Sequence, residues 1–98
     1  MKYVVMIGYD EKPSGLNCSE YCVGTFDNYL EAYGRAILHL NDVIRDTEDS
    51  SAITISPIEF WGDYGYRMKL IGQEDITDYV IIYRVEDFNT DSDRRWKD

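Results

Sequence analysis

The fold is decided by residues 28–46, which read NYLEAYGRAILHLNDVIRD and predict one long amphipathic helix. Apolar residues recur at alternating spacings of three and four, which places them along one side of a helix with 3.6 residues per turn. The stripe consists of Leu30, Tyr33, Ile37, Leu40 and Ile44, with Ala36 and Val43 widening it. Asn28 and Glu31 have the spacing of a capping box, so we expect the helix to begin there.

Two other residues of this helix carry information. Gly34 costs up to about 1 kcal/mol relative to alanine in a helix interior, so we expect it to mark a close approach of another backbone. His39 lies on the side away from the stripe, near Arg35, Asp42 and Asp46 by three- and four-residue spacing. This arrangement is typical of a solvated helix face with local ion pairs, and it does not favour a general base.

Extended segments precede the helix. Residues 2–9 carry apolar side chains on both faces, which predicts a strand in the interior of a sheet. Residues 10–19 have the composition of a loop, with Pro13 and Gly15 in the middle. Residues 20–26 predict a short second strand, which Gly24 weakens.

Three further strands are predicted after the helix. Residues 53–60 alternate, but the phase changes at Pro57, which indicates a bulge in an edge strand. Gly62-Asp63 is typical of a two-residue type II′ hairpin turn. The strand that follows, residues 64–70, has one apolar face and one wet face that carries Arg67 and Lys69, and residues 78–85 form the last strand.

Together these elements predict an α+β domain. Strands joined by hairpins, with one amphipathic helix, favour a largely antiparallel sheet of four to five strands in the order β-β-α-β-β-β, with the helix across one face. We expect the domain to span residues 1–85 and residues 86–98 to form a polar, mobile tail. If the helix covers the tyrosine-bearing strand faces, the loop, the tail, a dimer or a partner has to cover the opposite face. That face would carry Val4, Met6, Val80 and Ile82.

Composition and charge restrict the class of partner. Ninety-eight residues, 44 % of them apolar and 14 % aromatic, are typical of one domain that folds by itself. Nineteen acidic against ten basic residues give a net charge of −9, which repels phosphate backbones and anionic lipid and attracts basic proteins. The alternative is that this charge only keeps the protein soluble. No apolar run is long enough to span a membrane, and residues 1–10 lack the basic region and the long apolar stretch of a secretory leader. We therefore expect a cytoplasmic protein.

No pattern indicates catalysis, a cofactor or a metal. The sequence has no glycine-rich phosphate loop, nucleophile elbow or paired metal-binding histidine motif. Residues 87–98 imitate the acidic spacing of a calcium loop, but Ser92 stands where the turn needs glycine. Cys18 and Cys22 lie about 13 Å apart on an extended segment, beyond disulfide reach, so we expect both to be reduced. An enzyme that relies on a helper subunit is the least favoured alternative.

Aromatic residues and carboxylates are the remaining candidates for function. Tyrosine and tryptophan supply rigid contact area at protein interfaces, and nine tyrosines and two tryptophans are present. We expect an exposed group around the Gly62-Asp63 turn, with acidic residues at strand ends beside it. The predicted partner-binding residues are Trp61, Asp63, Tyr64, Tyr66, Glu74, Asp75 and Asp78. The alternative is that these aromatic rings brace the hairpin across its strands.

These features lead to two hypotheses of different class. The first is a small acidic protein-binding module that inhibits a basic, nucleic-acid-handling partner such as a nuclease by mimicking spaced phosphates. In size and charge balance the chain resembles small acidic proteins that occupy nucleic-acid channels, including phage-encoded antagonists of host nucleases; the resemblance is of composition alone. The second is a structural domain without enzymatic activity that forms a homodimer through its uncovered sheet face.

Overall fold

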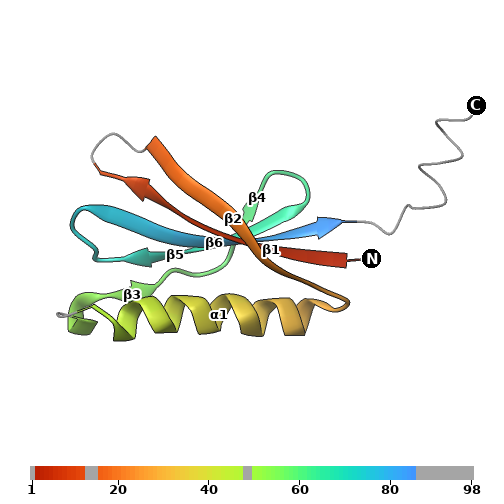
Figure 1. Ribbon diagram of the computed structural model, residues 1–98, viewed down its shortest axis with the longest axis horizontal. Helices are drawn as coiled ribbons and strands as arrows, with labels where there is room; N and C mark the ends of the chain where they lie inside the picture. Colours follow the sequence, from red (N-terminus) through yellow and green to blue (C-terminus); the bar gives the residue numbers. More distant parts are fainter. Residues whose placement is uncertain (1, 13–15, 48–49, 86–98) are drawn as a thin grey trace, which may run out of the picture.

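The computed structural model describes residues 2–12, 16–47 and 50–85. It contains one helix and a six-stranded antiparallel sheet, with the helix packed on one face of the sheet (Figure 1). The predicted α+β class, with a largely antiparallel sheet and the helix across one face, is therefore confirmed. In the predicted order β-β-α-β-β-β, residues 53–60 count as one strand; in the structure they form two short ones, so four strands follow the helix. The predicted tail, residues 86–98, and the calcium-like spacing within it lie outside the described residues.

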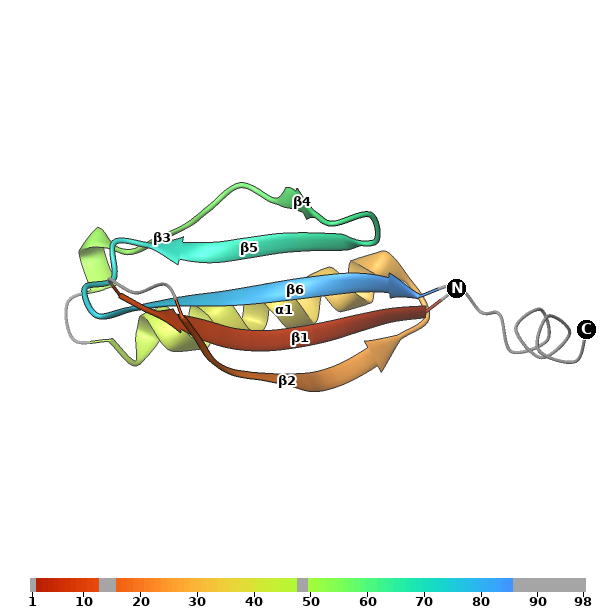
Figure 2. The same cartoon turned by 90° about the horizontal axis from the view of Figure 1, so that it is seen from above.

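The sheet has the strand order β2-β1-β6-β5-β3, and β4 also pairs with β5 (Figure 2). The strands are β1 (Lys2–Glu11), β2 (Leu16–Phe26), β3 (Thr54–Ile55), β4 (Glu59–Trp61), β5 (Gly65–Ile71) and β6 (Ile76–Val85). The first strand lies between β2 and β6, as its two apolar faces predicted.

The predicted loop over residues 10–19 is wrong in extent. Strand β1 continues to Glu11 and β2 already begins at Leu16, since the two strands pair along most of their length. Register shifts between Val5 and Met6 and between Tyr9 and Asp10 leave extra residues in β2. The backbone pairing of β1 with β2 thus extends into residues whose composition is typical of a turn.

Helix α1 (Tyr29–Arg45) begins as its capping residues predicted. The side chain of Asn28 accepts a hydrogen bond from the backbone N–H of Glu31 at 2.8 Å, and its amide nitrogen donates to Oε1 of Glu31 at 3.0 Å. The helix ends at Asp46, whose N–H donates to the carbonyl of Asp42. Within the part of the chain that the structure describes, no helix has the length and apolar character to cross a membrane.

The helix is rotated relative to the predicted apolar stripe. Its fully buried residues are Ala32, Ala36 and Leu40, while Leu30 is 78 % exposed and Leu38 is 53 % exposed. The two alanines are small, so this face brings the helix backbone closest to the sheet. At Gly34 nothing lies within 4 Å of the position that a Cβ would take, so the predicted close approach within the chain is wrong.

The core lies between α1 and one face of the sheet. Antiparallel register pairs Val5 with Ile82 and Ile7 with Val80, so odd-numbered residues of β1 share a face with even-numbered residues of β6. The buried set is Val5, Ile7, Ala32, Ala36, Leu40, Ile53, Met68, Leu70, Val80 and Ile82. The expectation that α1 covers the tyrosine-bearing face of both strands is therefore wrong for β6, whose Tyr79 and Tyr83 belong to the other face of the sheet.

At Pro57 the structure has a break between two short strands in place of the predicted bulge within one strand. Strands β3 and β4 both pair with β5, and Ser56 bridges the gap: its N–H donates to Lys69 O at 2.8 Å and its hydroxyl accepts from Lys69 N at 3.0 Å. The hairpin that follows has three loop residues, not two, because Trp61 pairs with Gly65. Gly62 has the positive φ, 71°, that the turn requires.

Candidate functional site

The predicted partner-binding residues fall into two groups at opposite ends of β5. Trp61, Asp63, Tyr64 and Tyr66 belong to the β4–β5 hairpin, whereas Glu74, Asp75 and Asp78 belong to the β5–β6 turn and the start of β6. Figure 2 shows these turns at opposite ends of the sheet. The seven residues of β5, at about 3.4 Å each, place the two turns more than about 20 Å apart, so the two groups do not form one site.

The tip of the β4–β5 hairpin, residues 57–64, is exposed along its whole length. Its aromatic residues are Phe60, 81 % exposed, Tyr64, 58 % exposed, and Trp61, 42 % exposed. Phe60 pairs with Tyr66 on one face, and alternation places Trp61 and Glu59 on the other. Figure 1 shows β4 and its turn leading away from α1. The tip also carries the carboxylates of Glu59 and Asp63 and contains no lysine or arginine.

A stacked arginine holds the base of this hairpin. The guanidinium of Arg67 lies 4.3 Å from the ring centre of Trp61 and 4.6 Å from that of Tyr79. Its Nη2 donates to Oδ2 of Asp10 at 3.0 Å, and its Nε has no acceptor among the described residues. Arg67 is only 8 % exposed, so the predicted wet face of β5 is wrong here. Flat aromatic faces and a carboxylate together accommodate a weakly hydrated guanidinium that water would otherwise surround.

Tyr79 completes this layer. Its hydroxyl donates to Oε2 of Glu20 at 2.6 Å, which ties β6 to β2 across β1. Burial raises the pKa of Tyr79, and the hydrogen bond to Glu20 raises it further. The phenol hydroxyl therefore stays neutral, and the ring contacts the guanidinium of Arg67.

A second arginine lies over an exposed hairpin ring. The guanidinium carbon of Arg84 is 5.9 Å from the ring centre of Tyr64, and the N–H of Arg84 donates to the Tyr64 carbonyl at 2.6 Å. Two of the three aromatic residues at the tip thus each contact an arginine of this chain.

Other aromatic rings connect the hairpin to α1. Ring centres are 5.8 Å apart for Phe60 and Tyr66, 5.5 Å for Tyr66 and Tyr29, and 5.8 Å for Tyr29 and Tyr3. Tyr66 is half-buried within this chain of rings. Tyr66 therefore braces the hairpin by packing, although it was predicted as a contact residue. Phe60 was not predicted as a contact residue, yet it is the most exposed aromatic residue in the part of the chain that the structure describes.

No protein-family model, curated protein or solved structure matches this chain. The function of the hairpin therefore has to follow from its own chemistry.

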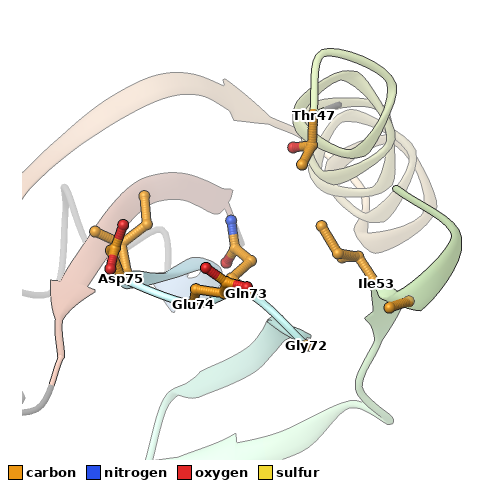
Figure 3. A pocket seen from close by; sticks show the side chains of 8 residues that line it. Thr47, Ile53, Gly72, Gln73, Glu74 and Asp75 are labelled. Atoms are coloured by element: carbon orange, nitrogen blue, oxygen red, sulfur yellow. The ribbon is translucent and has the colours of Figure 1, made fainter. Parts of the chain in front are cut away.

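At the other end of β5, Glu74 and Asp75 line a cleft of about 610 Å³. Figure 3 shows Thr47 and Ile53 across the opening from Gln73, Glu74 and Asp75. Glu74 and Asp75 are exposed. Lys12, the residue after β1, bonds to the backbone of this turn: Lys12 N donates to Asp75 O at 2.8 Å, and Lys12 Nζ donates to Gln73 O. The turn that carries these two carboxylates therefore already binds an ammonium group of the chain itself.

Asp78 is half-buried and held in place. Its Oδ2 accepts from Nε2 of Gln73 at 2.7 Å, and its N–H donates to Oε1 of the same side chain at 2.7 Å. Beside it, His39 lines a pocket of about 130 Å³ with Tyr9 and Tyr21. Burial lowers the pKa of His39, against the effect of Asp78, so the predicted solvated position of this histidine is wrong.

The described residues offer little to bind a metal. No three histidine, cysteine, aspartate or glutamate side chains among them come together. The Cys22 thiol is free and exposed, and it contacts the carbonyl of Gly24 at 3.6 Å. The residues that sequence reasoning missed are Glu59, Phe60, Arg67 and Arg84. The run Glu-Phe-Trp-Gly-Asp-Tyr, residues 59–64, is the signal that was present for the first two.

Proposed function

We propose that this chain is a protein-binding module that docks the tip of its β4–β5 hairpin on a basic surface of a partner protein. The observation that carries the proposal is the exposure of Phe60, Trp61 and Tyr64 beside two carboxylates, with no basic residue in the tip. Exposed aromatic clusters of this kind are costly in water and are enriched at protein interfaces. The solubility of the protein does not require three exposed aromatic residues within residues 60–64.

Charge defines the partner. A net charge of −9 speeds encounters with basic surfaces and suppresses encounters with acidic ones. Basic surfaces that are flat or grooved commonly serve to bind nucleic-acid phosphates. We therefore infer that the module acts as an antagonist of a nucleic-acid-handling protein, whose nucleic acid it would displace from the surface that it covers.

The experiment compares capture of partner proteins by the wild type and by charge-matched variants. Glu59→Gln with Asp63→Asn removes two negative charges at the hairpin, and Glu74→Gln with Asp75→Asn removes two at the other end of β5. We expect the first pair to abolish capture of a basic protein that the second pair retains. We also expect added nucleic acid to compete with the captured protein. Equal effects of the two pairs would contradict docking through the hairpin.

Phe60 supplies the apolar part of the contact. It is largely exposed, so Phe60→Ser should leave the free energy of unfolding nearly unchanged, while loss of a central aromatic contact weakens binding by at least about tenfold. Titration calorimetry with the captured partner measures the affinity, and urea unfolding measures the stability. Ile71→Ser is the matched control, since Ile71 is an exposed apolar residue at the other end of β5. A Phe60→Ser variant that binds as tightly as the wild type would exclude this ring from the interface.

Self-association through the outer face of α1 is a second candidate function. Leu30, Gly34 and Leu38 follow one another at four-residue spacing, both leucines are exposed, and no described residue lies within 4 Å of the Cβ position at Gly34. In an antiparallel pair of helices, Leu38 of a second copy fits against the notch at Gly34, and the acidic first turn with Glu31 faces the basic last turn with Arg45. The occupant proposed for this face is thus a second copy of the chain.

Sedimentation at increasing concentration tests this second candidate. A dimer that resists salt and is lost in Leu38→Lys, but not in Ile71→Lys, would support it, because apolar burial responds weakly to ionic strength. A monomer at all concentrations would exclude it and leave the hairpin proposal unaffected.

A further inference from the structure

We infer that the hairpin tip recognises arginine, in preference to lysine, on the partner. The site consists of the rings of Trp61 and Tyr64 with the carboxylates of Glu59 and Asp63. This inference rests on the proposed function and narrows it, since it names the chemical group that the basic partner presents.

The stacking of arginine on these rings is already realised within the chain. Arg67 lies 4.3 Å from the ring centre of Trp61, and Arg84 lies 5.9 Å from that of Tyr64. Both residues remain exposed, Trp61 by 42 % and Tyr64 by 58 %, so each ring keeps surface that a second cation can reach. The negative potential of an aromatic face attracts a second cation there as it does the first.

The carboxylates beside the rings are not paired with a cation of the described part of the chain. Glu59 lies opposite Arg67 in the β4–β5 register, yet the ion pair of Arg67 is with Asp10. No ion pair between described residues involves Glu59 or Asp63. Both residues are exposed, so their carboxylates can pair with a cation that a partner presents.

Arginine fits this combination better than lysine. A guanidinium is planar and weakly hydrated, so it stacks on a ring while its N–H groups pair in a bidentate manner with a carboxylate. A lysine ammonium is compact and strongly hydrated, and it offers a carboxylate only a point charge. The acidic end of β5 gives the contrast: its cleft is lined by Glu74 and Asp75 without any aromatic ring, so charge alone acts there.

Titration with hexaarginine and hexalysine tests the inference. We expect both peptides to bind at low salt, because they carry the same charge, with hexaarginine tighter by about two- to fivefold for each ring that stacks. In amide NMR spectra, the hexaarginine shifts should concentrate at residues 59–64. In the Trp96→Phe background, the fluorescence of Trp61 should change with hexaarginine more than with hexalysine.

Two variants make the test specific. Tyr64→Leu keeps an apolar side chain but removes the ring, so it should reduce the ratio of the hexaarginine affinity to the hexalysine affinity. Glu59→Gln should weaken the binding of hexaarginine more than that of hexalysine. The Glu74→Gln, Asp75→Asn double variant should retain the preference. Equal binding of the two peptides to the wild type, or a preference that Tyr64→Leu leaves intact, would overturn the inference. The proposed function is judged separately, by capture of a partner with the hairpin charge variants, so either can fail without the other.

Discussion

Arg67 is the residue whose environment differs most from what its position in the sequence indicates. A strand alternation places it on a wet face, yet two rings cover its guanidinium and Asp10 pairs with it. An arginine can be buried in this way because its long stem packs as an apolar group and its flat head stacks on aromatic faces. The base of the hairpin, and with it the direction of Trp61, depends on this contact.

Substitution of Arg67 should destabilise the protein. Arg67→Ala leaves a gap between Trp61 and Tyr79 and removes the partner of Asp10, so we expect a loss of about 2–3 kcal/mol in the free energy of unfolding. Arg67→Met keeps most of the volume and eliminates the Nε that lacks an acceptor, so its loss should be smaller. Urea unfolding measures both. A loss below about 1 kcal/mol in Arg67→Ala would show that the stack is not structural.

Two glycines should respond to alanine in opposite directions. At Gly34 a Cβ meets nothing and the helix gains propensity, so Gly34→Ala should stabilise by up to about 1 kcal/mol. At Gly65 a Cβ would lie 2.5 Å from the carbonyl oxygen of Trp61, so Gly65→Ala should destabilise and distort the hairpin. Thermal unfolding should show a rise of a few degrees for the first and a fall for the second. A destabilised Gly34→Ala would indicate that another molecule already fills the notch.

At the scale of elements, the packing of α1 against the sheet explains the environment of His39. The charged groups that act on it are Asp78 of β6 and Arg35 and Asp42 of its own helix. Burial is the largest influence and lowers its pKa from 6.5, because a charged imidazole is disfavoured away from water. The helix surface that the sequence presents as solvated thus contributes to the contact between layers.

This shift makes stability depend on pH. The relevant pH window runs from about 6.5, the pKa of the histidine in the unfolded chain, down to its lower pKa in the folded chain. In this window the unfolded chain binds the proton more readily than the folded chain does, so the free energy of unfolding falls as the pH decreases. Above about pH 6.5 both states are neutral at His39 and this loss of stability does not occur. His39 is the sole histidine, so its NMR titration is unambiguous and should have a midpoint below 6.5. His39→Gln should flatten the dependence; a midpoint at or above 6.5 would contradict the burial argument.

The hairpin and the β5–β6 turn are elements of opposite chemistry. The hairpin combines aromatic rings with carboxylates, and the turn combines carboxylates with Lys12 and a cleft that has no aromatic ring among its described lining residues. Because β5 is rigidly paired on both edges, the two remain separated by its length. The two turns therefore act as independent surfaces, and substitutions in one should be additive with substitutions in the other.

At the scale of the whole molecule, net charge governs the encounter with a partner. With a net charge of −9, the association rate with a basic partner should fall steeply as salt rises, while the dissociation rate, set by the aromatic contacts, should change little. Binding to a surface-immobilised partner, recorded at a series of salt concentrations, measures the association rate and the dissociation rate separately. Glu74→Gln with Asp75→Asn serves as the control and should lower only the association rate. A salt effect confined to the dissociation rate would contradict long-range steering.

Much of the architecture follows from local patterns. The capping pair Asn28 and Glu31 marks the start of α1, runs that are apolar on both faces mark β1 and β6, and alternation marks β5. The phase change at Pro57 marks the break between β3 and β4. Each of these signals is contained within a few neighbouring residues. The exposed position of the hairpin tip also follows from its glycine turn, so Trp61, Asp63 and Tyr64 were predictable as surface residues.

The type and order of the elements follow from the amino-acid sequence alone, because helix and strand periodicities arise from the backbone geometry of each segment. Which face of each element is buried depends on contacts between elements and becomes known only from the three-dimensional fold. The pairing of Val5 with Ile82 joins residues far apart in the chain, and a register one residue different would have turned Tyr79 and Tyr83 toward α1. The burial of Arg67, the outward position of Leu30 and the separation of the aromatic and acidic ends all follow from that register and from the rotation of the helix on its two alanines.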